Sequence, residues 1–119
     1  MRRVSIVVGL VVLAACCAAF ARGGAPVTAF RLADAGAACR LTGERLVCSN
    51  LQVRAGLSLP ASGTPRAVPA QVWWDAATPV LKRWTHGRLT CRVAAAAIVC
   101  HNASGASISV DGSHIAVAL

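Results

Sequence analysis

Two stretches of the chain share one order of apolar and polar positions. Residues 39–50 and 91–102 align at a constant offset of 52 residues, with five identities in twelve positions and two aliphatic exchanges. Each stretch begins with a cysteine, and a second cysteine follows after eight residues. Between the two cysteines, apolar and polar side chains alternate toward the middle. Such alternation predicts two antiparallel strands joined by a tight turn. Two copies are too few for a repeat array, so we predict one domain with a duplicated hairpin.

A two-residue turn at Gly43-Glu44 sets the register of the first hairpin. It places Cys39 opposite Cys48 in a non-hydrogen-bonded pair. Cα atoms in such a pair are about 4.5 Å apart, so a disulfide closes without bending the strands. One face of the hairpin is then apolar and the other polar. The cysteine face also carries Leu41 and Leu46, and the opposite face carries Arg40, Thr42 and Arg45.

The second hairpin predicts a bridge between Cys91 and Cys100 by the same register, with Ala95-Ala96 at the turn. Alanine is a poor turn residue, and four successive alanines favour helix by local propensity. We keep the hairpin because cysteines nine residues apart do not lie on one helical face. Closing each ten-residue loop is worth about 2.5 to 3 kcal/mol in the chain-entropy model. The two crossed pairings remain formally possible.

The rest of the chain predicts further short strands and, after the N-terminal segment, no helix longer than about two turns. Three prolines and one glycine predict an irregular loop over residues 60–70. Asp111-Gly112 is a strong hairpin signal and places Ile108 opposite Ile115. We therefore expect an all-β fold, a small disulfide-stapled sheet or sandwich-like domain. The remaining strands are expected over residues 27–32, 51–59, 71–74, 79–84, 87–93, 107–110 and 113–117.

The N-terminal segment predicts an export signal. Arg2 and Arg3 precede an apolar run over residues 4–15, followed by small residues. Ala19-Phe20-Ala21 matches a signal-peptidase site, which gives a signal over residues 1–21 and a single β domain over residues 22–119. The alternative is a lipoprotein signal over residues 1–15, with lipidation of Cys16. We favour cleavage after Ala21, since it leaves an even set of four cysteines in an oxidising compartment.

No transmembrane span is expected in the mature form, because Arg22 and two glycines end the apolar run and no second run of about 20 residues follows. The protein is then secreted, periplasmic or bound to the cell envelope, or lipid-anchored through Cys16. The formal net charge of the whole chain is +8. This charge favours anionic envelope polymers or acidic lipid headgroups as partners, but it also keeps a small exported protein soluble. The basic residues form no block, so we expect no specific nucleic-acid binding.

Aromatic and basic residues cluster between positions 73 and 88, and this cluster is the best binding candidate in the sequence. Indole rings beside positive charge suit anionic polymers. Packing in the core is the competing interpretation. In a strand Trp73 and Trp74 point to opposite faces, so we expect one to be buried and the other exposed near Lys82, Arg83 or Arg88. The candidate residues are Trp73, Trp74, Lys82, Arg83, Trp84 and Arg88, with His86 between them.

The sequence gives little indication of a catalytic or metal-binding site. The acid/base candidates His86, His101, His114, Asp75 and Asp111 fall into no known catalytic motif. Cysteines separated by eight residues suit disulfides and not a structural zinc site, so we expect no metal and no cofactor. These features favour a non-enzymatic exported module with a binding or structural role. The alternative is a small secreted hydrolase or inhibitor.

Several short motifs together resemble a domain of unknown function found in small exported actinobacterial proteins. The resemblance extends over most of residues 27–117 and implies export and a bacterial origin, without a mechanism. Members tend to carry Pro-Ser-Gly-Asn where this chain has residues 33–36, and many have an additional cysteine pair. The shared motifs are Phe30-Arg31, the first cysteine pair, Pro79-Val80-Leu81, Gly87-Arg88-Leu89-Thr90-Cys91, Val99-Cys100-His101-Asn102, and Gly105 before Ile108-Ser109-Val110.

Overall fold

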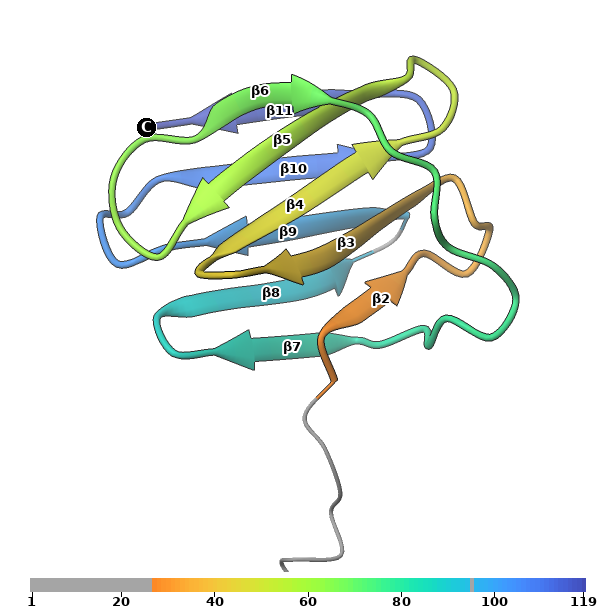
Figure 1. The fold of residues 1–119 in the computed structure, drawn as a ribbon, viewed down its shortest axis with the longest axis horizontal. Helices are drawn as coiled ribbons and strands as arrows, with labels where there is room; N and C mark the ends of the chain where they lie inside the picture. The colour runs from red at the N-terminus through yellow and green to blue at the C-terminus, as the bar shows by residue number, and fades with distance from the viewer. Residues whose placement is uncertain (1–26, 95) are drawn as a thin grey trace, which may run out of the picture.

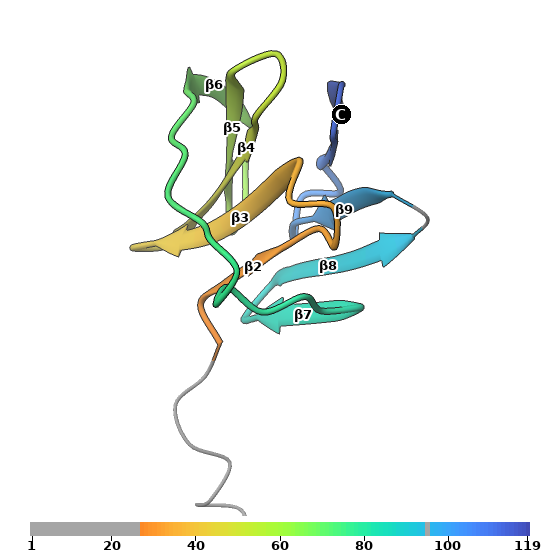
Figure 2. The same ribbon diagram turned by 90° about the vertical axis from the view of Figure 1, so that its right-hand side faces the viewer.

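The computed structural model describes residues 27–94 and 96–119, and the described part folds as a β-sandwich without helices (Figure 1). The predicted signal, both cleavage sites, Cys16 and Ala95 lie outside the described residues. Two five-stranded antiparallel sheets face each other (Figure 2). One contains β2 (Ala29–Arg31), β3 (Ala37–Thr42), β4 (Arg45–Asn50), β5 (Ala55–Pro60) and β6 (Arg66–Pro69) in that order. The other contains β7 (Arg83–His86), β8 (Leu89–Ala94), β9 (Ala97–His101), β10 (Ser107–Asp111) and β11 (Ile115–Ala118).

Both predicted hairpins form with the predicted register. In β3–β4, Cys39 lies opposite Cys48, with Cα atoms 4.0 Å apart. In β8–β9, Cys91 lies opposite Cys100, also with Cα atoms 4.0 Å apart. Each pair forms a disulfide, so the local connectivity is confirmed and the crossed alternatives are not formed. The duplicated hairpin thus supplies the centre of each sheet.

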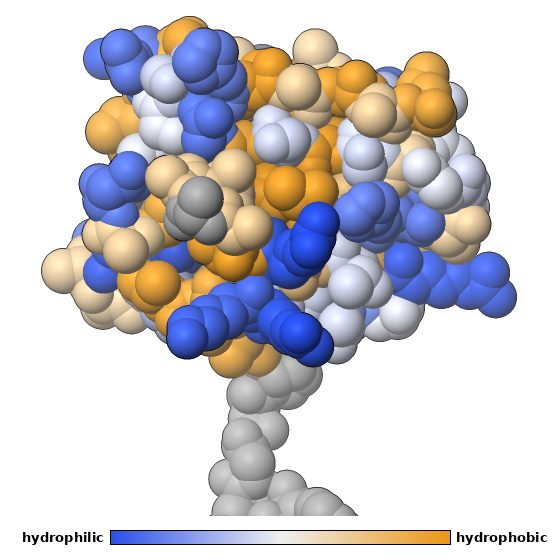
Figure 3. Space-filling view, turned by 180° about the vertical axis from the view of Figure 1, so that it is seen from behind, coloured by the Kyte–Doolittle hydropathy of each residue, from blue (hydrophilic) through white to orange (hydrophobic). Residues whose placement is uncertain are grey.

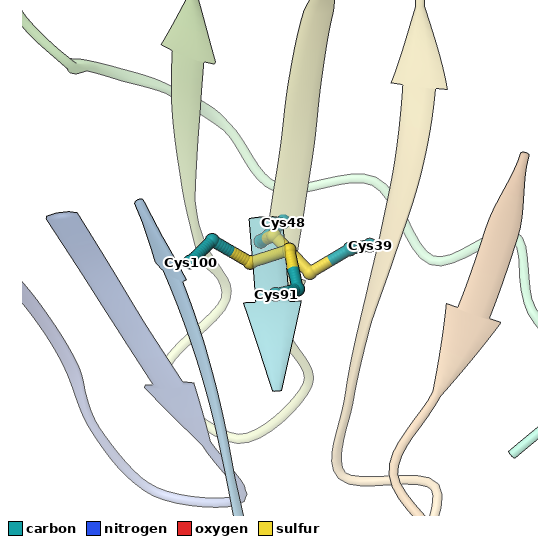
Figure 4. Close-up of a disulfide and its surroundings, with 4 residues drawn as sticks. All are labelled: Cys39, Cys48, Cys91 and Cys100. Atoms are coloured by element: carbon teal, nitrogen blue, oxygen red, sulfur yellow. A yellow bond between two sulfur atoms is a disulfide. The ribbon is translucent and has the colours of Figure 1, made fainter. Parts of the chain in front are cut away.

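The two disulfides lie against each other at the middle of the sandwich (Figure 4). The Sγ atoms of Cys39, Cys48 and Cys100 are all within 4.8 Å of one another. All four cysteines are fully or almost fully buried. The inner faces pack apolar side chains around them, as alternation in a two-sheet fold requires. They include Phe30, Leu32, Leu46, Leu57, Leu59, Trp84, Leu89, Ile98, Ile108 and Val110.

Residues 51–59 differ from the expected strand because a turn occupies the first four of them. Asn50 accepts a hydrogen bond from the Val53 amide through its side-chain oxygen, at 2.8 Å. This local bond outcompetes the strand, as asparagine side chains do at turns. Arg54 completes the reversal with a positive φ of 54°, and Leu51 and Val53 are consequently exposed. The strand begins only at Ala55.

Residues 60–70 are not irregular throughout, because Arg66–Pro69 forms the edge strand β6 and pairs with β5. Proline is compatible with an edge strand, since one side of that strand needs no amide donor. The loop proper is therefore short. Asn102 holds it in place by donating hydrogen bonds to the carbonyl oxygens of Pro60 and Gly63, at 3.0 and 2.9 Å.

Residues 70–82 form an irregular strap, and the strands expected over 71–74 and 79–84 are replaced by one short strand, β7. The strap connects the two sheets and crosses the outer face of the β2–β6 sheet (Figures 1 and 2). Arg31 on β2 holds the strap in place with two hydrogen bonds. Its backbone amide donates to the Pro79 carbonyl and its Nε donates to the Thr78 carbonyl, both at 2.9 Å. The turn expected around residues 75–78 is present, closed by the Thr78 amide on the Asp75 carbonyl.

The C-terminal hairpin forms, but its turn lies one residue later than predicted. Asp111 precedes the turn and accepts hydrogen bonds from the amides of Ser113 and His114 through Oδ1. Its own amide donates to the His114 carbonyl, which leaves Gly112-Ser113 as the turn. Ile108 therefore lies opposite Val117, and Ile115 lies opposite Val110. No helix among the described residues has the length and apolarity needed to cross a bilayer.

Candidate anion-binding face

Trp84, one of the predicted binding residues, belongs to the core. Only 5% of its surface is exposed, and its ring lies 5.6 Å from that of Phe30. Its indole N–H donates to the Val27 carbonyl at 2.7 Å, which satisfies the polar end of the buried side chain. Trp84 therefore holds β7 against the opposite sheet and offers no surface for a ligand.

One of the adjacent pair Trp73 and Trp74 is buried as expected, but the other is half-buried and not exposed. Trp74 is buried and donates its indole N–H to the Ala35 carbonyl at 2.8 Å. Trp73 is half-buried and carries the Arg40 guanidinium 4.7 Å from its ring centroid. The cation on this indole is Arg40, and not one of the basic residues that we expected there. Strand alternation is not the cause of the split, because both residues lie in the strap.

The exposed basic residues of the predicted cluster lie along β7 and its turn. Lys82 precedes the strand, Arg83 points outward from it, and Arg88 lies in the β7–β8 turn with Gly87, whose φ is +60°. His86 stacks beside Trp84, with ring centroids 6.1 Å apart. The predicted cluster is thus divided by the sandwich, and its charges and its indoles do not share one surface.

Arg83 has a neighbour that the sequence analysis did not select. Arg92 on β8 lies directly opposite it, and both side chains are exposed on the outer face of the β7–β11 sheet. The same row continues to Val99 on β9 and Ser109 on β10. The β8–β9 register predicts that Arg92 lies on this outer face, but only the pairing of β7 with β8 brings it opposite Arg83.

The row beside the two arginines carries hydrogen-bonding groups. Thr85, Thr90 and His101 lie opposite one another on β7, β8 and β9. All three are exposed. Figure 3 looks onto this face, and strongly hydrophilic side chains lie across its lower part, where β7 and β8 run. We refer to Arg83, Arg92, Thr85, Thr90 and His101 as the basic face.

The basic face lacks counter-charges. Like charges directly opposite each other in a sheet destabilise it, and carboxylates would normally offset them. In the described part of the chain, no arginine or lysine forms an ion pair with a carboxylate, and the ion pair present joins His114 to Asp111. Asp111 is on the same outer face, but it lies opposite Ala97 near the far corner and is held by its own turn. The arginines therefore present unneutralised charge to solvent.

The hairpin tip Asp111, Ser113 and His114 brings together the residue types of a hydrolase triad without the geometry. Ser113 Oγ lies 2.8 Å from His114 Nδ1, and Asp111 Oδ1 lies 3.5 Å from the same nitrogen. A proton relay needs the hydroxyl and the carboxylate on different ring nitrogens. Hydrogen bonds from the Ser113 and His114 amides lower the pKa of Asp111, so these contacts stabilise a turn.

Two cavities share Asp34 and Ala96 on their walls. The larger, of about 790 Å³, also contains Asp111 and Ser113, and the smaller, of about 460 Å³, is lined mainly by apolar residues with Lys82. His86 and His101 line neither of them. The carboxylates and these histidines are therefore not gathered in one concave site.

The cysteine sulfurs do not form a metal centre in this state. Cys39, Cys48 and Cys100 have the proximity of a ligand set, but each sulfur is held in a disulfide and carries no thiolate charge. Their arrangement staples the fold. Comparison of the chain with protein-family models, curated proteins and solved structures gives no match.

Proposed function

We propose that this protein is an exported, non-enzymatic module that binds an anionic polymer or acidic headgroups of the cell envelope through its basic face. The observation that carries the proposal is the exposed pair Arg83 and Arg92, opposite each other and without a carboxylate partner in the described chain. An anion between the two guanidinium groups would remove their repulsion. Guanidinium also suits phosphate and carboxylate, because its planar donor fork forms two parallel hydrogen bonds.

The surroundings of the pair support binding over catalysis. Hydroxyl and imidazole groups of Thr85, Thr90 and His101 extend along neighbouring strands and supply further hydrogen bonds for a linear ligand. The face is a strand surface with rigid spacing, and the disulfide Cys91–Cys100 joins β8 and β9, two of the three strands that carry these residues. Preorganised charges of this kind reduce the ordering cost of binding.

Export is supported by the N-terminal signal pattern and by the disulfides, which persist in oxidising compartments. The intact mass of the exported protein tests this part. A chain beginning at Arg22 with four hydrogens missing supports soluble export, and a diacylglyceryl group on Cys16 supports the lipoprotein alternative. A protein that retains residues 1–21 contradicts both.

Binding of the oxidised protein to an anionic polymer, measured at low and physiological salt, tests the function. The double variant Arg83→Gln/Arg92→Gln should bind at least tenfold more weakly, with an unchanged fold by circular dichroism. Arg54→Asn is a suitable control, because it removes one charge at a remote turn and asparagine tolerates the positive φ there. The proposal fails if the double variant binds like the unmodified protein. It also fails if binding ignores salt.

A further inference from the structure

A second group of arginines surrounds Ser58 on the opposite side of the molecule, the outer face of the β2–β6 sheet. Arg66 on β6 lies directly opposite Ser58 on β5. Arg45 on β4 reaches the same residue, because its Nε donates to Ser58 Oγ at 2.6 Å. Register therefore places Arg66 beside Ser58 on this face, and the Arg45 guanidinium reaches the Ser58 hydroxyl from the neighbouring strand.

The hydrogen bonds of Ser58 are incomplete. Only 2% of the residue is exposed, and its oxygen already accepts from Arg45. Among the described residues, nothing accepts the hydroxyl proton of Ser58. Buried polar groups normally have partners, and leaving one without costs free energy. An acceptor supplied from outside the protein would complete the set.

The charges at this place are unbalanced as well. Within the described chain, the Nη groups of Arg45 and the guanidinium of Arg66 have no hydrogen-bonded or ionic partner. The site is thus a set of donors without an acceptor: the Nη atoms of Arg45, the Arg66 guanidinium and the Ser58 hydroxyl. Such a set matches a tetrahedral oxyanion, which offers several acceptor oxygens and negative charge.

The strap leaves this part of the sheet uncovered. The backbone amide of Gln71 donates a hydrogen bond to Ser49 Oγ, and the side-chain oxygen of Gln71 accepts one from the Arg40 guanidinium. The same guanidinium lies over the Trp73 ring. These contacts hold Arg40 under the strap. Among the described residues, Arg45 and Arg66 form no hydrogen bond with the strap. They are the first residues of β4 and β6, and Figure 1 shows these two strands beginning at the end of the sheet away from the strap.

We infer that Arg45, Ser58 and Arg66 form a binding site for one phosphate group. The Ser58 hydroxyl orients Arg45 and donates to one phosphate oxygen, while the two guanidinium groups take the others. The site is separate from the basic face, which lies on the other sheet. Its existence does not depend on the proposed function, and the two can succeed or fail independently.

The test is titration of the oxidised protein with inorganic phosphate, followed by the Arg45 Nε–Hε signal and the backbone amides of β5 and β6 in ¹⁵N NMR spectra. A second titration with dimethyl phosphate distinguishes a free phosphate from a phosphodiester within a polymer. We expect saturable shifts in β4, β5 and β6 with at least one probe, distinct from shifts of the basic face on β7 and β8. Arg66→Gln should weaken binding about tenfold, and Ser58→Ala should weaken it by a similar factor.

Arg54→Asn is the matched control, since it removes one arginine charge at a remote turn and should leave phosphate affinity unchanged. The inference is overturned by shifts that do not saturate with either probe. Equal affinity in Arg66→Gln would overturn it too, and would leave Arg66 as a charge that protects the edge strand from pairing. A loss in Arg54→Asn equal to that in Arg66→Gln would reduce the effect to general charge and overturn the inference.

Discussion

Asn50 and Asn102 occupy equivalent positions in the two hairpins, and each fastens its own sheet to the opposite one. Asn50 ends β4 and donates its side-chain amide to the Asp111 carbonyl of β10. Asn102 follows β9 and donates to the Pro60 carbonyl, at the end of β5. The internal repeat therefore duplicates a connection between sheets as well as a disulfide.

Replacing Asn102 by alanine should lower the free energy of unfolding by about 2 to 4 kcal/mol. The variant loses two donors and the Oδ1 acceptor of the Ser104 and Ala106 amides, and leaves buried backbone groups unpaired. Urea unfolding measures the change. A loss below about 0.5 kcal/mol would mean that the bonds to the loop contribute nothing.

The single variant Cys39→Ala should rearrange its remaining disulfide. The freed Cys48 thiolate lies within 4.8 Å of Cys100 Sγ and can attack it, which forms a Cys48–Cys100 bond and releases Cys91 as a thiolate. The number of disulfides is conserved, and no oxidant is required. Peptide mapping after rapid acid quenching should find this bond between the sheets. Retention of only Cys91–Cys100, with Cys48 free after prolonged incubation at pH 8, would contradict the prediction.

Replacing each of two tryptophans of the predicted cluster by alanine should change the free energy of unfolding by very different amounts. Trp84→Ala removes a core side chain beside Phe30 and should cost about 3 to 5 kcal/mol of unfolding free energy. Trp73→Ala removes a half-buried indole from the strap and should cost about 1 kcal/mol or less. Denaturant unfolding compares them. Similar costs for both would mean that the strap is part of the main core.

Acid should weaken the C-terminal hairpin through Asp111. Hydrogen bonds from the Ser113 and His114 amides and the neighbouring His114 lower its folded-state pKa below the ordinary 3.8. Stability from this carboxylate is therefore fully present above pH 3.8 and lost as the pH falls through the lower folded value. NMR titration of the Asp111 carboxyl carbon measures the midpoint. A midpoint at or above 3.8 contradicts this, and Asp111→Asn, as a control, should abolish the acid-dependent change at the turn.

The sequence predicted the parts of the fold that local chemistry determines. A two-residue turn and cysteines nine apart fixed both hairpin registers, because a one-residue slip would reverse every side chain. The segments that failed depend on contacts between distant residues or on single polar side chains. Asn50 ended a strand whose alternation was otherwise good, and Asp111 moved a turn by one residue. The course of the strap depends on Arg31 and Gln71, 40 residues apart, and no local pattern reveals it.

The candidate site was predicted only in part for the same reason. Arg83 and Arg88 were selected by their proximity to tryptophans in the sequence, yet Trp84 faces the core and Trp73 lies under Arg40. Arg92 was not selected, because Arg83, the residue that lies opposite it, belongs to a different strand. On a β-sandwich, charged side chains become neighbours along rows that run across the strands. Such a row can be predicted only when the registers of neighbouring hairpins are combined.

The salt dependence of binding to an anionic polymer tests the role of Arg83 and Arg92 most directly. Each neutralised phosphate contributes about 0.7 to 0.9 to the slope of log affinity against log salt concentration. Arg83→Gln/Arg92→Gln should therefore reduce the magnitude of that slope by about 1.4 to 1.8, while Arg54→Asn leaves it unchanged. An unchanged slope in the double variant, with the fold intact, would contradict the assignment of the basic face as the anion contact.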